Sequence, residues 1–368
     1  MSTMAGNNPL LLLIAFSHIF SSNFVDGRMM SNHTIESSDG SYVVECVDIY
    51  KQPAFSHPLL KNHTMQKRPT SSPIAFKERS KDEIFQRWKK NGKCPIGTIP
   101  IATSQFFQNR THPSQIVGSA HEYVTVTENG GPYYGATASL NIWSPSTSNV
   151  IGEYSSSQIW VVAGKGRDYN TIEAGWKVDS GVNKPQFFIF WTGDNYDNTG
   201  CYNLNCPGFV QTNRKIAIGA DLSPVSTYNA NQIQIQLTIH KDQSSGNWWL
   251  RYGQEEIGYW PGSILTSLAK RSSQISWGGV AINSRINGKH TSTQMGSGHF
   301  SSEGYGKASY VGNLGYIDNS GATIAPNPQS LVRLVTNPAC YDFSFGKGGT
   351  QLGLHFYFGG PGFSPRCQ

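Results

Sequence analysis

The sequence predicts an all-β protein, preceded by a smaller segment of mixed character. Charged residues make up 14% of the 368 residues, aromatic residues make up 12%, and there are 39 glycines. Few charges and many glycines are typical of short strands joined by tight turns rather than of helices. From His121 onward, short alternating or continuous apolar runs recur between turns rich in Gly, Asn and Ser. This pattern indicates a β-sandwich or a barrel.

The run 171–178 is the strand that matters most for function. Successive side chains of a strand point to opposite faces, so Ile172, Trp176 and their alternate neighbours face the core. Glu173 lies on the other, polar face beside Gly175, where the backbone of a ligand could approach closely. The alternative is an exposed glutamate without a function. The other strands are expected at 121–127, 134–143, 159–163, 187–191, 233–239, 248–252, 275–283, 308–316 and 354–358.

Two helices are expected. Ser80-Lys-Asp-Glu83 forms a capping box, and the apolar residues that follow predict a short helix over 81–91. The second helical pattern covers 262–271.

The N-terminus has the pattern of an export signal. Residues 9–20 form an apolar run that is too short to span a bilayer and is followed by small residues, which predicts a signal peptide over 1–22. No later stretch predicts a membrane helix. The net charge of +6 resides mainly in 23–118, where 13 Lys and Arg oppose 8 Asp and Glu. The larger remainder therefore has no electrostatic support for binding nucleic acid.

The six cysteines fit an exported protein with disulfides, although six cysteines allow 15 pairings. Their positions favour Cys46–Cys94, Cys201–Cys206 and Cys340–Cys367. A metal site is a weaker alternative, because neither a Cys-x-x-Cys pair nor a His-x-x-x-His spacing accompanies them. Glycosylation sequons begin at Asn32, Asn62 and Asn109.

Several motifs, in one order along nearly the whole chain, resemble the plant neprosin family. In the N-terminal third they are Leu59-Leu-Lys-Asn-His63, Trp88-Lys-Lys-Asn-Gly-Lys-Cys94-Pro95 and Gly97-Thr-Ile-Pro-Ile101. In the larger part they are Gln158-Ile-Trp-Val161, Thr171-Ile-Glu-Ala-Gly-Trp176, Thr199-Gly-Cys-Tyr-Asn-Leu204, Gly246-Asn-Trp-Trp-Leu250, Gly258-Tyr-Trp-Pro261, His290-Thr-Ser-Thr-Gln-Met-Gly-Ser-Gly-His-Phe300 and Phe358-Gly-Gly-Pro-Gly362.

The resemblance implies a glutamic endopeptidase that is made as a precursor, works in acid and cleaves at proline. It implies a signal peptide (1–22), a small α+β activation segment (23–118) and an antiparallel, jelly-roll-like β-sandwich (119–368). The expected partners are a peptide or protein substrate and the chain's own activation segment, which would cover the cleft. No cofactor or metal is required. The expected location is the apoplast or cell wall, or the vacuole.

The chemistry of this family needs two carboxyl groups, one to accept a proton from water and one to donate a proton to the substrate. Glu173 matches the first family glutamate. The second belongs in a Trp-Gly-Gly-Glu motif, which here reads Trp277-Gly-Gly-Val280. Since valine neither donates nor accepts a proton, catalysis is expected to be impaired. Without a second carboxyl, Glu173 is expected to titrate near an ordinary glutamate pKa of about 4.3 before burial effects.

Three residues are candidates to substitute for the missing acid. Glu303 lies in a glycine-flanked loop, where a solvated glutamate is the simpler interpretation. Gln158 or Gln294 could pair with Glu173, because related glutamic peptidases pair Glu with Gln, but an amide is a poor proton donor.

Other functions have weaker support. A non-catalytic protein that binds peptide or wall polymer is the main alternative, and a groove lined by Trp248, Trp249, Tyr259 and Trp260 is one possibility, although such aromatic residues are more often core. His290 and His299 are interpreted as structural. There is no Gly-x-Ser-x-Gly elbow for a serine hydrolase, and no paired carboxylates for a glycosidase.

Overall fold

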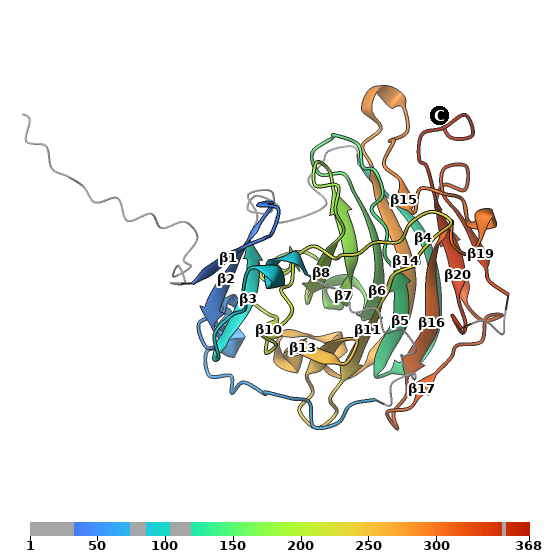
Figure 1. Cartoon of the computed structure of the whole chain (residues 1–368). Coiled ribbons are helices and arrows are strands. Elements are labelled where there is room, and N and C mark those ends of the chain that lie inside the picture. The colour runs from blue at the N-terminus through green and yellow to red at the C-terminus, as the bar shows by residue number, and fades with distance from the viewer. Residues whose placement is uncertain (1–32, 74–85, 104–118, 348–350) are drawn as a thin grey trace, which may run out of the picture. The chain divides into compact units, whose positions relative to one another are not determined.

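The structure is a computed structural model that describes residues 33–73, 86–103, 119–347 and 351–368 (Figure 1). The expected signal peptide (1–22) and the residues that precede the expected boundary between 118 and 119 lie outside these residues, so the three expected segments stay predictions. No helix in the described parts of the chain has the length and apolarity needed to cross a membrane.

The larger part of the chain is an antiparallel β-sandwich, as predicted, with no α-helix among the described residues. One sheet has seven strands. In spatial order these are β18 (Val332–Val335), β4 (Ala120–Tyr133), β14 (Ser272–Asn283), β6 (Tyr154–Ala163), β7 (Asn170–Asp179), β8 (Gln186–Thr192) and β9 (Cys201–Tyr202).

The facing sheet has ten strands. Its main path is β10 (Val210–Gln211), β13 (Glu255–Trp260), β12 (Trp248–Tyr252), β11 (Gln234–Lys241), β5 (Gly135–Asn141), β16 (Ser309–Ile317), β20 (Phe356–Gly360) and β15 (Met295–Gly296). Two short strands pair beside this path, β17 (Thr323–Ile324) with β16 and β19 (Asp342–Phe345) with β20.

Apolar side chains from both sheets form one core. Two tryptophans of the seven-stranded sheet also donate hydrogen bonds across it. The indole N–H of Trp176 donates to the carbonyl of Asn141 at 3.0 Å, and that of Trp277 donates to the carbonyl of Thr137 at 3.2 Å. Because both acceptors are on β5, these bonds satisfy buried indole groups and tie the two sheets together.

The N-terminal segment forms a separate three-stranded sheet of β1 (Thr34–Glu36), β2 (Val43–Asp48) and β3 (Thr98–Thr103). It nevertheless packs as part of the same molecule, because its Leu60, Ile99 and Ile101 belong to the main core. Trp88 is 1% exposed and packs in a smaller cluster with Ala217 and Ala220 of the sandwich.

Two aspartates of the sandwich hold this segment through polar contacts. Asp221 accepts a hydrogen bond from the Tyr42 hydroxyl at 2.5 Å and pairs with Arg87 at 3.0 Å. Asp242 accepts hydrogen bonds from the Gln66 amide at 2.6 Å and from the backbone N–H of Thr70 at 3.0 Å. Burial would raise the pKa of Asp242, but the bonds from Thr70 and Gln66 outweigh it and lower the pKa to about 2. Mild acid therefore leaves this contact charged.

The helix predicted over 262–271 is wrong, and so is the described part (86–91) of the helix predicted over 81–91, whose residues 81–85 lie outside the described residues. Apart from the strands, the regular structure of the described residues consists of short 3-10 turns. Among the described residues of 81–91, Gln86 is extended, because its amide bonds both backbone groups of Ala217 at 2.8 Å. In 262–271 the side-chain oxygen of Asn170 accepts hydrogen bonds from the backbone N–H groups of Thr266 and Leu268. These bonds replace helical ones, and the segment forms two separate 3-10 turns. The 3-10 turns are η1 (Pro53–Ser56), η2 (Pro58–Leu60), η3 (Arg87–Lys90), η5 (Gly166–Asp168), η6 (Gly262–Ile264), η7 (Ser267–Ala269), η8 (Ile286–Gly288) and η9 (Ser301–Glu303).

The cysteines pair as their positions indicated, Cys46–Cys94, Cys201–Cys206 and Cys340–Cys367. No disulfide joins the N-terminal segment to the sandwich. Of the three sequons, only Asn62 lies among the described residues, where its side chain is exposed. Glycosylation stays a prediction.

Trp88→Ala is expected to lower the free energy of unfolding by about 3–5 kcal/mol, as is typical when a buried tryptophan is truncated. Tyr50→Ala is the matched control, because Tyr50 belongs to the same segment but is 62% exposed, and it should change stability by less than about 0.5 kcal/mol. Urea unfolding of the full chain measures both. An equal effect of the two substitutions would contradict the packing role of Trp88.

Candidate functional site

Side chains along β7 alternate between two faces, as predicted, but the outward face that carries Glu173 is buried as well. Ile172, Ala174, Trp176 and Val178 lie in the core between the sheets. Glu173 faces the other way and yet is only 6% exposed, and all ten residues of β7 are buried. The expectation that Glu173 stands outside the packed layer is therefore wrong, because side chains of neighbouring strands and loops form a second, smaller layer over this face.

Gly175 makes room for the protein itself rather than for a ligand. It pairs across the strands with Gln158, and a Cβ atom at Gly175 would meet the carbonyl oxygen of Ser157 at 2.1 Å and the Cβ of Gln158 at 2.6 Å. Any larger residue would push β6 away. The glycine thus allows Gln158 to lie directly beside the side chain of Glu173.

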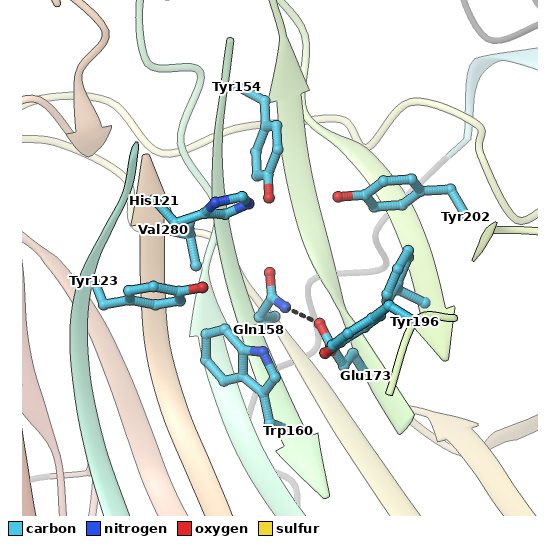
Figure 2. Close-up of a pocket in the computed structure, with 10 residues that line it drawn as sticks. His121, Tyr123, Tyr154, Gln158, Trp160, Glu173, Tyr196, Tyr202 and Val280 are labelled. Carbon is cyan, nitrogen blue, oxygen red and sulfur yellow. Dashed lines mark hydrogen bonds between the residues drawn. The ribbon is translucent and has the colours of Figure 1, made fainter. Parts of the chain in front are cut away.

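These two residues form one wall of a pocket of about 260 Å³ on the outer face of the seven-stranded sheet (Figure 2). The pocket is mainly aromatic. Its lining consists of His121, Tyr123, Tyr154, Gln158, Trp160, Glu173, Phe190, Tyr196, Tyr202 and Val280. Since these residues come from β4, β6, β7, β8, β9, β14 and the loop after β8, the pocket exists only in the folded sheet.

The Glu173 carboxyl is held by three side chains. Thr171 donates a hydrogen bond to Oε1 at 2.9 Å, and the Gln158 amide donates to Oε2 at 2.6 Å. Burial raises the pKa of Glu173 to about 7, although hydrogen bonds from Thr171, Gln158 and Trp160 oppose that rise. Burial thus moves the pKa of Glu173 well above the ordinary value expected before burial effects, because desolvation of the charged form outweighs the three hydrogen bonds.

Gln158 has a fixed orientation in this site. Its amide oxygen accepts a hydrogen bond from the Ser156 hydroxyl at 2.7 Å, while its amide nitrogen donates to Glu173. Ser156 and Gln158 alternate along β6 and so share the pocket face. The amide is thus presented as a hydrogen-bond donor beside the carboxyl.

Val280 occupies the place where the second glutamate is expected. It lines the pocket, is 3% exposed, and pairs with Ser156 of β6 on one side and Tyr123 of β4 on the other. Its packing partners Tyr154 and Ile282 are also buried. The position faces Glu173 across the pocket, but it supplies methyl groups instead of a carboxyl (Figure 2).

The structure does not bring Glu303 or Gln294 to Glu173. Glu303 lies in η9 and hydrogen-bonds the Tyr228 hydroxyl at 2.8 Å and His299 at 2.9 Å. Slight burial would raise its pKa, but these two bonds lower it. Gln294 accepts a hydrogen bond from the backbone of Ser146 at 2.9 Å. Neither residue lines the pocket, so Gln158 alone among the considered substitutes contacts Glu173.

The aromatic set at β12 and β13 is core, not groove. The residues Trp248, Trp249, Tyr259 and Trp260 are each 0% exposed. The Tyr259 hydroxyl contacts His63 at 2.7 Å and accepts the N–H of Gln66 at 2.9 Å, both in the N-terminal segment.

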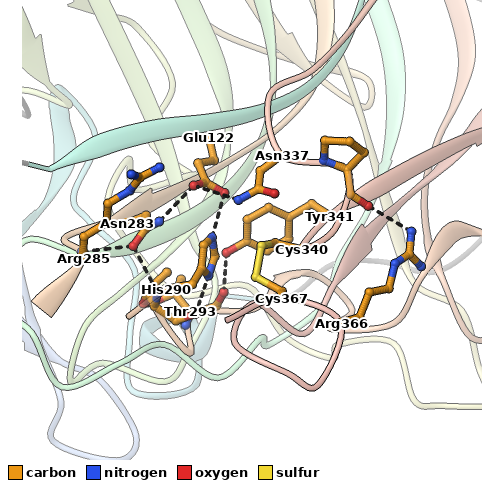
Figure 3. Close-up of a disulfide and its surroundings, with 12 residues drawn as sticks. Glu122, Asn283, Arg285, His290, Thr293, Asn337, Cys340, Tyr341, Arg366 and Cys367 are labelled. Carbon is orange, nitrogen blue, oxygen red and sulfur yellow. Dashed lines mark hydrogen bonds and ion pairs between the residues drawn. A yellow bond between two sulfur atoms is a disulfide. The ribbon is translucent and has the colours of Figure 1, made fainter. Parts of the chain in front are cut away.

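The buried polar residues around the Cys340–Cys367 disulfide form a hydrogen-bond network that stabilises the fold (Figure 3). His290 lies close to both sulfur atoms, but the sulfurs are bonded to each other and the imidazole contacts Glu122 at 2.9 Å. Burial would raise the pKa of Glu122, but bonds from His290 and Asn283 lower it. This buried network supports the structural interpretation of His290 over a metal site.

The described residues of the N-terminal segment contribute nothing to the pocket lining. Residues 33–73 and 86–103 instead contact the ends and edge of the sheets, through Asp221, Asp242 and the core. The expected cover over the cleft is therefore not provided by these residues, and it stays a prediction for the segment as a whole.

The sequence alone predicts little of the pocket. Its aromatic lining comes from segments far apart in the chain, namely Tyr123, Tyr154, Trp160, Phe190, Tyr196 and Tyr202. The local signal is alternation, because His121 and Tyr123 share one face of a strand and Gln158 and Trp160 share one face of another. Only the order β4-β14-β6-β7-β8 places these faces side by side.

Glu173→Gln is expected to make stability less dependent on pH. The folded-state pKa of Glu173, about 7, lies above its ordinary value. The folded protein therefore binds the extra proton between about pH 4.5 and 7, and wild-type stability falls as pH rises through that window. The variant should lose this fall, whose size is on the order of 3 kcal/mol. Urea unfolding at pH 5 and pH 8 measures it, and parallel curves for the two proteins would contradict the buried carboxyl.

Comparison with solved structures finds low-scoring similarity to two peptidases and an agglutinin. Scytalido-glutamic peptidase, solved with a transition-state analogue inhibitor, is 11% identical, and the match covers 65% of this chain and 98% of that one, with a TM-score of 0.37. SCP-B, a member of the Eqolisin family solved with a tripeptide, is 9% identical over 65% and 98%, with a TM-score of 0.34. CG-16, an agglutinin from chicken liver, is 7% identical over 45% and 95%, with a TM-score of 0.24.

Two family models match the sequence itself. The Neprosin activation peptide matches residues 34–123, and Neprosin matches residues 152–361. The second match covers more than half of the chain and contains Glu173, Gln158 and Val280. The chain therefore belongs to the Neprosin family.

Proposed function

We propose that this protein is a secreted, neprosin-like glutamic peptidase that hydrolyses peptides slowly in the pocket around Glu173. The observation that carries the proposal is the buried contact of 2.6 Å between Gln158 and Glu173 in the wall of an aromatic pocket. It places a carboxyl and an amide donor side by side, where one peptide bond can reach both.

Glu173 would act as the base and then as the acid. When ionised, it takes a proton from a water molecule as that water attacks the substrate carbonyl carbon, and it later returns the proton to the leaving nitrogen. A pKa of about 7 suits both steps near neutral pH, because the group then gains and loses a proton at little free-energy cost. The acid activity that the family resemblance implies would need the second carboxyl, which Val280 does not supply.

Gln158 would polarise the substrate carbonyl. Its amide nitrogen carries two N–H donors, of which one bonds Glu173 and the other remains for the substrate. An amide cannot supply a proton, so it replaces only part of what a second carboxyl would do. The loss of that carboxyl at Val280 should reduce turnover by about 10²–10⁴-fold relative to a complete pair.

The proposed substrates are peptides that contain proline. The resemblance to the neprosin family implies this preference, and the aromatic rings of the pocket supply flat apolar surfaces against which a pyrrolidine ring can pack. Residues 23–118 would be the activation peptide of the precursor. The three disulfides are typical of proteins that fold in oxidising compartments, which supports export to the apoplast, the cell wall or the vacuole.

A non-catalytic function is the second candidate. Val280 and the aromatic lining would suit a protein that binds a peptide or a wall polymer without cleaving it. The two candidates differ in whether bound peptide is hydrolysed.

The first prediction is that wild type cleaves proline-containing fluorogenic peptides slowly and that Glu173→Gln abolishes cleavage. Val280→Glu should raise the rate, since it restores the second carboxyl in a position that already faces the pocket. The matched control is Val332→Glu, at an exposed valine of β18, which should leave the rate unchanged. Cleavage that survives Glu173→Gln would refute the assignment, whereas binding without any cleavage would favour the second candidate.

The second prediction concerns pH. For wild type, kcat/KM should rise with pH through about 7, because Glu173 must be ionised to accept a proton and its pKa is raised to that value. Val280→Glu should extend activity toward acid, since two neighbouring carboxyls share one proton and remain singly ionised at lower pH. Rates measured from pH 3 to 8 test this. A wild-type optimum at pH 3–4 would contradict the role of a single buried carboxyl.

A further inference from the structure

Tyr123 is the pocket residue next to the missing carboxyl. It lies on β4 and pairs directly with Val280 of β14. Residues paired across antiparallel strands point to the same side of the sheet, so both side chains enter the pocket. Figure 2 shows the Tyr123 hydroxyl directed into the pocket beside Val280, on the side opposite Glu173.

The Tyr123 hydroxyl differs from the other phenols of the pocket, because they are already engaged. The hydroxyls of Tyr154 and Tyr202 hydrogen-bond each other, and the Tyr196 hydroxyl lies 3.5 Å from the Thr171 hydroxyl. Within the described ranges, no hydrogen bond is formed by the hydroxyl of Tyr123. It is therefore an available donor in a half-buried site.

We propose that Tyr123 is a catalytic residue, whose hydroxyl donates a hydrogen bond to the carbonyl oxygen of the scissile peptide bond in place of the carboxyl that Val280 lacks. The inference rests on the proposed function. As the water oxygen bonds to the carbonyl carbon, Glu173 takes the water proton and the carbonyl π electrons move to the oxygen. Tyr123 stabilises that oxyanion without giving up its proton. When the oxyanion collapses and the C–N bond breaks, Glu173 returns its proton to the leaving nitrogen.

The phenol is suited to this role and not to proton transfer. Burial and the nearby charge of Glu173 raise the pKa of Tyr123 to about 12, so the hydroxyl stays a neutral donor throughout the working pH range. With Gln158 on β6, it would form two donors on either side of β14. Loss of one such donor typically reduces kcat by about 10²–10³-fold.

Tyr123→Phe tests the proposal, since it removes the hydroxyl and keeps the ring. It should lower kcat by about 10²-fold or more with KM changed less than about threefold, and leave the pH profile in place. Tyr133→Phe is the matched control, because it removes a phenol from the same strand outside the pocket. In the Val280→Glu background the penalty of Tyr123→Phe should shrink, since a carboxyl then supplies the donor. If Tyr123→Phe lowered kcat equally in the wild-type and Val280→Glu backgrounds, or in neither, the proposal that Tyr123 replaces the missing carboxyl as a donor would be refuted.

A binding measurement separates this inference from the proposed function. A proline-containing phosphinic peptide, whose tetrahedral anionic centre resembles the attacked carbonyl, should bind Tyr123→Phe at least about 10-fold more weakly than wild type. The corresponding uncleaved amide peptide should bind both proteins alike. Calorimetry measures both affinities even if wild type hydrolyses no peptide. Absence of hydrolysis would refute the proposed peptidase activity but not the donor role of Tyr123. Equal loss for both peptides, or loss for neither, would refute the donor role of Tyr123.

Discussion

The hydrogen bond between Gln158 and Glu173 is the interaction on which the site depends. It requires β6 and β7 to approach closely, and they can do so because Gly175 has no side chain where Gln158 lies. It also requires the faces of β7 to be oriented so that Glu173 points outward. Trp176 maintains this orientation, because its side chain lies in the core and its indole N–H donates a hydrogen bond to the opposite sheet. The chemistry of the outer face therefore depends on packing in the interior.

Burial gives this single carboxyl properties that a paired carboxyl obtains by another route. In a pair, mutual repulsion keeps one proton bound. Here desolvation does so, because aromatic rings cover Glu173 and Val280 adds apolar surface opposite. The valine thus removes one functional group and makes the surroundings of the other less polar. Besides this carboxyl, uncharged hydrogen-bond donors face the pocket, among them an amide and a phenol.

The N-terminal segment is integrated into the sandwich more deeply than a detachable cover would be. Leu60, Ile99 and Ile101 reach the main core, and Asp221 and Asp242 hold the segment through charged hydrogen bonds. The low pKa of Asp242 keeps its bonds to Thr70 and Gln66 charged in mild acid. Separation of the segment would expose apolar surface as well as break ion pairs, so it has to overcome packing and not charge alone.

The sequence by itself determined the fold class, most of the longer strands of the sandwich and the disulfide pairing, because these follow from local periodicity and from cysteine position. Motif resemblance also singled out Glu173 and Val280, which line the same pocket, while their catalytic meaning stays a prediction. Tertiary structure decided the rest. In 262–271 and in 86–91, the described part of the helix expected over 81–91, side-chain hydrogen bonds with distant residues favour 3-10 or extended backbone, Asn170 with Thr266 and Gln86 with Ala217. The partner of Glu173, its raised pKa and the place of Tyr123 arise from strands far apart in sequence, since strand order and burial are not local properties of a chain.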